Sequence, residues 1–128
     1  MQTLPPELHQ GVEEFNRAHF FEAHETLEDL WRGTSGPLRL FYQGLIQLAV
    51  ALYHLSNGNR RGALNLLSKG LDKLTAFQPT CQGIDVDSLC HEARTWLDRV
   101  RQAGNEELTV DPTQLPRIRW ITAERNVV

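Results

Sequence analysis

Apolar residues recur at helical spacing along most of this chain. Plotted at about 100° per residue, the pattern predicts helices separated by turns rich in glycine, proline and asparagine. Each predicted helix carries an apolar stripe that must face a common core. The predicted helices cover residues 5–18, 20–32, 38–56, 60–77 and 85–103. The sequence therefore predicts an all-α fold, a compact bundle of helices packed as hairpins.

The second predicted helix, FFEAHETLEDLWR at 20–32, places ionisable residues unusually close to its apolar stripe. The stripe comprises Phe20, Ala23, Leu27 and Trp31. The border of that stripe is occupied by His24, Glu25, Glu28 and Arg32. Spacings of four residues allow ion pairs that stabilise a helix by about 0.2–0.5 kcal/mol each. The same border position also suits a functional site, so both interpretations stay open.

The third predicted helix, residues 38–56, is apolar on nearly every side, which is typical of a helix buried all round. One polar seam nevertheless runs along it. The seam comprises Gln43, Gln47, His54 and Asn57, together with Val50. A buried amide or imidazole without a partner costs about 1–3 kcal/mol. We therefore expect the seam to hydrogen-bond the border residues of the second helix, which would form a polar network between the two helices.

The pattern changes after Gly104. Pro112 and Pro116 preclude a long helix in this region. The tail still contains apolar residues that are unfavourable in water, namely Leu115, Ile118, Trp120 and Ile121. We expect an extended tail over residues 109–128 that packs back onto the helices, and a dimer contact is the competing interpretation.

Length and charge restrict the class of protein. A chain of 128 residues suffices for a single domain, residues 1–128, with its own core. The net charge of −3 gives no general attraction to nucleic acid or anionic membrane. Basic clusters such as Arg60, Arg61, Lys69 and Lys73 have acidic neighbours, so nucleic-acid binding is not expected.

Targeting signals and cysteines indicate the compartment. The N-terminus lacks the pattern of a secretory signal, and the most apolar run, residues 45–55, is too short to span a membrane. Cys81 and Cys90 form neither a redox pair nor a metal knuckle, so two reduced thiols are expected. These features predict a cytoplasmic protein without a membrane partner.

Two resemblances refine the fold. The second and fourth helices share an A-x-x-x-L pattern at Ala23 and Ala63 that is similar to the first helix of a tetratricopeptide unit. This similarity predicts related hairpin packing but no repeat array. In addition, FNRAHFFEAHETLEDLWRG at 15–33 with FYQGLIQLAVALYHLSNGNRRGA at 41–63 resembles the family of domain of unknown function 309.

The family resemblance extends over about residues 7–77 and implies a small all-helical domain with no established activity. It therefore assigns no catalytic role. It emphasises a set of positions that includes most of the polar seam: His24, Glu25, Glu28, Trp31, Gln43, Gln47, His54, Asn59 and Ala63.

Three kinds of function fit these residues. His24, Glu28 and His54 are ligand types for a divalent metal and would suit a hydrolase-like enzyme, but the Glu-x-x-His and His-Glu-x-x-His motifs are absent. Metal-free acid–base chemistry by Glu25 or Glu28 with His54 is a second possibility. The third is a non-enzymatic domain that binds a protein or a small molecule, as a monomer or homodimer and without a cofactor. We favour the third, with the metal-dependent enzyme as the alternative.

Overall fold

A computed structural model describes residues 3–121 of the chain, and it confirms the all-α fold class. The helices are α1 (Pro6–Asn16), α2 (Phe20–Arg32), α3 (Pro37–Ser56), α4 (Arg60–Leu74) and α5 (Val86–Ala103). Short 3-10 turns cover η1 (Thr75–Phe77) and η2 (Pro112–Gln114). The strands β1 (Thr80–Cys81) and β2 (Ile84–Asp85) pair antiparallel.

Turn and capping residues explain where the helices begin. Gly36, at φ 75°, adopts a left-handed conformation that favours glycine and leads into α3, whose first residue is a proline. The Asn59 side chain accepts a hydrogen bond from the Gly62 amide at 3.0 Å and thereby caps α4. Asp85 caps α5 in the same way, through the Ser88 amide at 3.0 Å.

Two details differ from the sequence prediction. The helix expected over 60–77 leaves α geometry after Leu74, and its last turn is the 3-10 helix η1. The segment expected as a plain loop after residue 77 contains the β1–β2 hairpin, whose tight turn has positive φ at Gln82 and Gly83. Strands of two residues are too short to produce an alternating sequence pattern, which explains why they escaped prediction.

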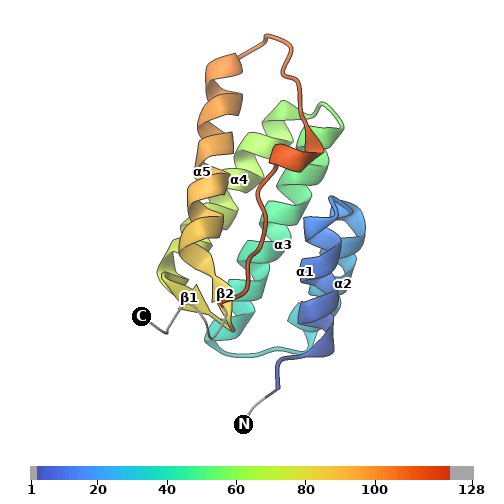
Figure 1. Ribbon diagram of the computed structural model, residues 1–128, viewed down its shortest axis with the longest axis vertical. Helices are drawn as coiled ribbons and strands as arrows, with labels where there is room; N and C mark the ends of the chain where they lie inside the picture. The colour runs from blue at the N-terminus through green and yellow to red at the C-terminus, as the bar shows by residue number, and fades with distance from the viewer. Residues whose placement is uncertain (1–2, 122–128) are drawn as a thin grey trace.

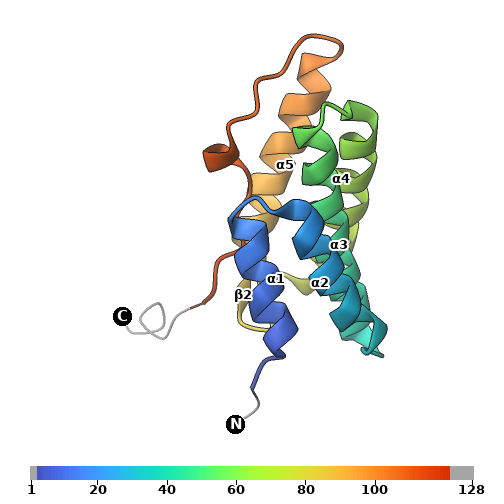
Figure 2. The same ribbon diagram turned by 90° about the vertical axis from the view of Figure 1, so that its right-hand side faces the viewer.

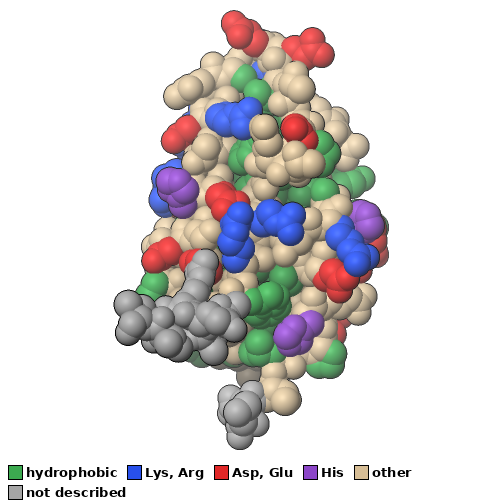
Figure 3. Space-filling model, in the orientation of Figure 1, with side chains coloured by type: hydrophobic (Ala, Val, Ile, Leu, Met, Phe, Trp, Pro, Cys, Tyr) green, Lys and Arg blue, Asp and Glu red, His purple; other side chains and the backbone are tan. Residues whose placement is uncertain are grey.

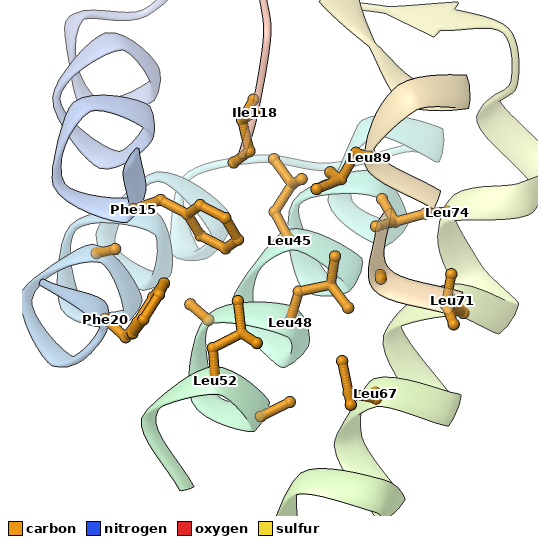
Figure 4. Close-up of a cluster of buried hydrophobic side chains, with 14 of the residues drawn as sticks. Phe15, Phe20, Leu45, Leu48, Leu52, Leu67, Leu71, Leu74, Leu89 and Ile118 are labelled. Atoms are coloured by element: carbon orange, nitrogen blue, oxygen red, sulfur yellow. The ribbon is translucent and has the colours of Figure 1, made fainter. Parts of the chain in front are cut away.

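Consecutive helices pack against one another, so that α3 lies between α2 and α4 (Figure 1). Figure 2 shows α1 and the C-terminal segment on one side of the molecule and α3 and α4 on the other. The core lies between these two sides. Figure 4 shows Leu45, Leu48 and Leu52 of α3 pointing into it, towards Phe15 of α1 and Leu74 of α4.

Glycine allows α3 and α4 to approach closely. A Cβ atom on Gly70 would lie 2.9 Å from Leu48 Cδ2 and 3.1 Å from the Gly44 carbonyl oxygen. Both distances are shorter than normal contacts, so a larger residue would push the two helices apart. The relative position of α3 and α4 is therefore fixed by backbone proximity as well as by apolar packing.

The C-terminal segment packs onto its own chain, as the intramolecular interpretation expected. Leu115 and Ile118 are buried, and Figure 4 shows Ile118 entering the core beside Leu45 and Leu89. The Asn16 carboxamide donates to the Ile118 carbonyl and accepts from the Ile118 amide, both at 2.8 Å. The part of the predicted tail at 122–128 lies outside the described residues.

The face that carries this segment has acidic and basic side chains interspersed, without a large patch of one sign (Figure 3). Arg119 pairs with Glu92 there. Such a mixed surface gives no broad attraction for nucleic acid. Among the described residues, no helix is long and apolar enough to cross a membrane.

Helix α3 is not buried all round, which corrects the sequence prediction. Its buried residues point towards α2, α4 and the core, but Leu40 and Tyr53 are 43% and 40% exposed. A nearly uniform apolar composition cannot indicate which side of a helix stays uncovered. The uncovered side of α3 is the side that carries the predicted polar seam.

Candidate functional site

Large exposed apolar side chains mark one surface of the protein. Within residues 3–121 they are Phe21, Leu40 and Tyr53, and all three belong to α2 or α3. The Phe21 and Tyr53 rings contact each other across the two helices, with centroids 5.7 Å apart. Exposed aromatic residues that gather in one place are typical of a binding surface.

A small, mainly apolar pocket lies beside this aromatic pair. Its volume is about 160 Å³, and it is formed where the start of α2 meets the end of α3. The lining residues are Phe20, Phe21, His24, Val50, Tyr53 and His54. The structure thus brings both predicted histidines to the wall of one pocket.

The border residues of α2 form a chain of polar contacts within their own helix. His24 Nε2 lies 2.9 Å from Glu28 Oε2, and Arg32 Nη2 lies 2.5 Å from Glu28 Oε1. Arg32 also reaches Asp29, whereas Glu25 is exposed. These side chains line a second pocket of about 180 Å³. The helical ion-pair interpretation therefore accounts for the partners of Glu28.

The expected hydrogen bonds between the α2 border and the α3 seam are not formed among the described residues. Residues four apart on one helix already face each other, so His24, Glu28 and Arg32 can pair within α2 without a partner on α3. The α3 seam is partly exposed, but the oxygen of Gln47 is buried and has no hydrogen-bond partner among residues 3–121. The network predicted between the helices is in fact two separate sets of contacts.

A third pocket, of about 230 Å³, lies at the other end of the same interhelical surface. It is lined by Glu28, Trp31, Gln43, Ile46 and Gln47. Within residues 3–121, Trp31 Nε1 and Gln47 Oε1 are buried and have no hydrogen-bond partner. One is a donor and the other an acceptor. The two residues that carry these buried, unsatisfied atoms both line the pocket.

The Trp31 ring is held in place from the side of α3. The Arg39 guanidinium lies 3.8 Å from the centroid of the ring, a cation–π geometry. The same guanidinium donates a hydrogen bond to the Trp31 carbonyl at 3.2 Å. The indole is thus positioned by contacts that leave its N–H group unused.

His54 and Asn57, the last two seam residues, take part in the turn between α3 and α4. His54 Nδ1 lies 3.3 Å from the side-chain nitrogen Nδ2 of Asn59, and the Asn57 side chain donates to the Tyr53 carbonyl at 2.9 Å. A Cβ atom on Gly62 would lie 2.8 Å from the His54 ring, so a larger residue at position 62 would force the ring to shift. These contacts fix the orientation of the ring that lines the aromatic pocket.

The three sequence candidates for a metal site do not form a metal centre. Among the described residues, no group of three or more histidine, cysteine, aspartate or glutamate side chains is arranged to hold a metal ion. His24 and Glu28 are adjacent, but they are occupied with each other. The free thiols of Cys81 and Cys90 lie outside the pockets just described, and burial raises the pKa of both.

We call the surface formed by these three pockets the α2–α3 groove. The second pocket shares His24 with the first and Glu28 with the third, so the three pockets are neighbours. The polar residues of the groove were predicted from the sequence, except Asp29, but the apolar residues Phe21, Ile46 and Tyr53 were not singled out. A signal for Phe21 was present, because it lies away from the apolar stripe of α2 where a phenylalanine is unexpected.

Two curated relatives align with the chain. An uncharacterized protein of Aquifex aeolicus (strain VF5) is 28% identical over 95 residues, which are 71% of this chain and 27% of that protein. The uncharacterized protein YpuF of Bacillus subtilis (strain 168) is 36% identical over 69 residues, 53% of this chain and 40% of that protein. The chain thus spans less than half the length of either relative.

A family match covers the groove. Residues 8–66 match the family described as Domain of unknown function (DUF309), and this range contains every residue that lines the three pockets. The C-terminal segment lies outside the match. The match confirms the resemblance of this part of the chain to the family of domain of unknown function 309 that its sequence motifs indicated.

Proposed function

We propose that this domain is a non-enzymatic binding module that recognises a protein segment through the α2–α3 groove. The observation that carries the proposal is the third pocket, where a buried indole N–H and a buried amide oxygen both lack partners within the described chain. A polypeptide backbone offers the matching groups, a carbonyl for Trp31 Nε1 and an N–H for Gln47 Oε1.

The aromatic pair supports a protein partner over a small polar ligand. Aromatic side chains are enriched in the centres of protein interfaces, where they contribute much of the binding energy. Phe21 and Tyr53 are exposed, lie in contact and border a pocket with a mainly apolar wall. The groove therefore combines an apolar anchor at one end with backbone-type hydrogen bonding at the other.

The exposure of the groove to solvent also distinguishes it from a polar network whose only role is to fix how α2 and α3 align. A register-fixing network should be sealed and fully hydrogen-bonded. Glu28 has a side chain that is 31% exposed, and Gln47 has an unsatisfied oxygen. Both features favour an interaction surface. A hydrolase-like metal centre has less support, since the described histidine and acidic residues do not converge on a common point.

Selection of peptides from a display library against the full chain tests the proposal. Peptides that are enriched should lose about tenfold or more in affinity for Gln47→Leu, which removes the carboxamide, and for Trp31→Phe, which removes the indole N–H, because both changes keep much of the side-chain volume. Arg117→Ala, an exposed position beside α1 and outside the groove, is the matched control and should bind normally. Enriched peptides that bind both groove variants as tightly as the natural sequence would refute the proposal.

A further inference from the structure

We propose that the segment recognised by the groove belongs to a second copy of this chain. The two copies pack with their α3 helices side by side and parallel, about a two-fold axis that runs along α3. This inference rests on the proposed function, because it names the partner of the same surface. Three independent features of the outer side of α2, α3 and α4 support it.

The first feature is the spacing of the uncovered residues of α3. Those of its outer seam are Leu40, Gln43, Gln47, Val50 and His54, and Asn57 continues the seam just beyond the end of the helix. Successive members are alternately three and four residues apart, and the exposed Tyr53 and Ser56 lie outside this spacing. This is the heptad spacing of a helix that packs against another helix in a left-handed coiled-coil geometry. All six residues are exposed or only partly buried, so the seam has no helix on it in the single chain.

The second feature is the negative charge along α2, on one side of the seam. Glu25, Glu28 and Asp29 line the second pocket together with a single arginine, Arg32. Arg32 contacts Glu28 and Asp29, which leaves the edge with more carboxylate than guanidinium charge. A surface that covers this edge favourably should therefore be basic.

The third feature is the positive charge along α4, on the other side of the seam. Lys73 lies against α3, since its Cβ is 3.3 Å from the place where a Gly44 Cβ would be, and Lys69 lies one turn earlier on the same side of α4. Neither lysine has an ion-pair partner among residues 3–121. The seam is thus flanked by an acidic edge and a basic edge.

Charge complementarity selects the direction of the axis. With an axis along α3, α2 of each copy lies over α4 of the other, so the acidic edge meets the basic edge twice. With an axis across α3, α2 lies over α2 and α4 over α4, and like charges oppose each other. The parallel arrangement is therefore the one in which both edges are paired.

The same arrangement serves the unsatisfied amide of α3. An axis along α3 places each seam residue beside its own counterpart, so Gln47 of one copy faces Gln47 of the other. A carboxamide is both a donor and an acceptor. The buried Gln47 oxygen can then accept a hydrogen bond from the second copy, and a polar residue at such a seam position fixes the register of the pair.

Sedimentation of the full chain with charge-reversal variants tests the edges. Lys69→Glu/Lys73→Glu makes both edges acidic, and Glu25→Lys/Asp29→Lys makes α2 basic beside the basic α4. For each variant alone, the dissociation constant of the dimer should be about tenfold higher than for the natural chain. An equimolar mixture of the two variants should regain the natural affinity. If either variant alone self-associated as tightly as the natural chain, the inference would be overturned.

Cross-linking tests the direction of the axis. In a Cys81→Ser/Cys90→Ala background, Gln43→Cys and Val50→Cys should each form a disulfide with itself, because every seam residue lies near the axis. An axis across α3 can bring at most one of these two positions beside its own counterpart, since they are about 10.5 Å apart along the helix and a disulfide joins Cα atoms less than about 7 Å apart. Arg117→Cys, on the opposite face, is the control that should not cross-link.

The failure of this inference can be told apart from failure of the proposed function. A chain that stays monomeric at millimolar concentration, yet binds peptides that are sensitive to Gln47→Leu, refutes the second copy as the partner and leaves the binding groove standing. Peptides that ignore the groove variants would refute both.

Discussion

Truncation of Ile118 measures how much the C-terminal segment contributes to the fold. The Ile118 side chain is 1% exposed and enters the core, although it lies far outside the family match at 8–66. Ile118→Ala removes three buried carbons, worth about 2.4 kcal/mol of transfer free energy, and leaves a cavity that adds to the loss. The backbone hydrogen bonds to Asn16 remain available. We expect the free energy of unfolding to fall by about 3 kcal/mol.

Urea denaturation followed by far-UV circular dichroism measures this change, and thermal unfolding should show a Tm lower by roughly 10 °C. Arg117→Ala is the matched control, because the neighbouring side chain is exposed and its loss should change stability by less than about 0.5 kcal/mol. All proteins are compared at one concentration, since self-association would stabilise the folded state. If Ile118→Ala were as stable as the control, the segment would not be part of the core.

Three further predictions concern the helices and the thiols. Glu28→Ala removes two half-exposed ion pairs on α2 and should cost only about 0.5–1 kcal/mol in urea denaturation; a loss above about 2 kcal/mol would indicate a buried network instead. Gly70→Val places side-chain atoms where Leu48 and the backbone of α3 already lie, so the same assay should show a loss of about 2–3 kcal/mol, and an unchanged stability would refute the close approach of α3 and α4. Burial raises the pKa of Cys81 and Cys90, so the folded state holds these protons more tightly than the unfolded state. Their contribution to stability is complete below about pH 9, the ordinary pKa of a thiol, and is lost as the pH rises through the higher pKa of the folded state, so the Tm should fall less steeply above pH 9 in a Cys81→Ser/Cys90→Ala variant.

The helices could be predicted from the sequence because their apolar residues recur at a clear period. The start of α2 at Phe20 and of α4 at Arg60 agrees with the pattern, since turn residues precede both. The β1–β2 hairpin could not be predicted, because two residues per strand give no alternation and the turn at Gln82 and Gly83 is not one of the strong hairpin dipeptides.

The site was predicted in its residue types but not in its pairing. Periodicity placed Gln47 and His54 on one side of α3, and the structure agrees. It could not show that this side lacks a covering helix, because Leu40 and Tyr53 are as apolar as the buried residues around them. Hydrogen bonds from the α3 seam to α2 were expected because the whole of α3 was assumed to be buried. The seam side of α3 is partly exposed, and those hydrogen bonds are not formed among the described residues.

The stability of Gln47→Leu tests most directly the central claim that the α3 seam serves binding rather than folding. The Gln47 oxygen is buried without a partner in the described chain, so an apolar residue of similar size removes an unsatisfied group. At a concentration where the natural chain is monomeric, urea denaturation should give this variant an equal or higher free energy of unfolding. A loss of about 1–3 kcal/mol would show that Gln47 completes a hydrogen-bond network that holds the fold, and it would contradict the account.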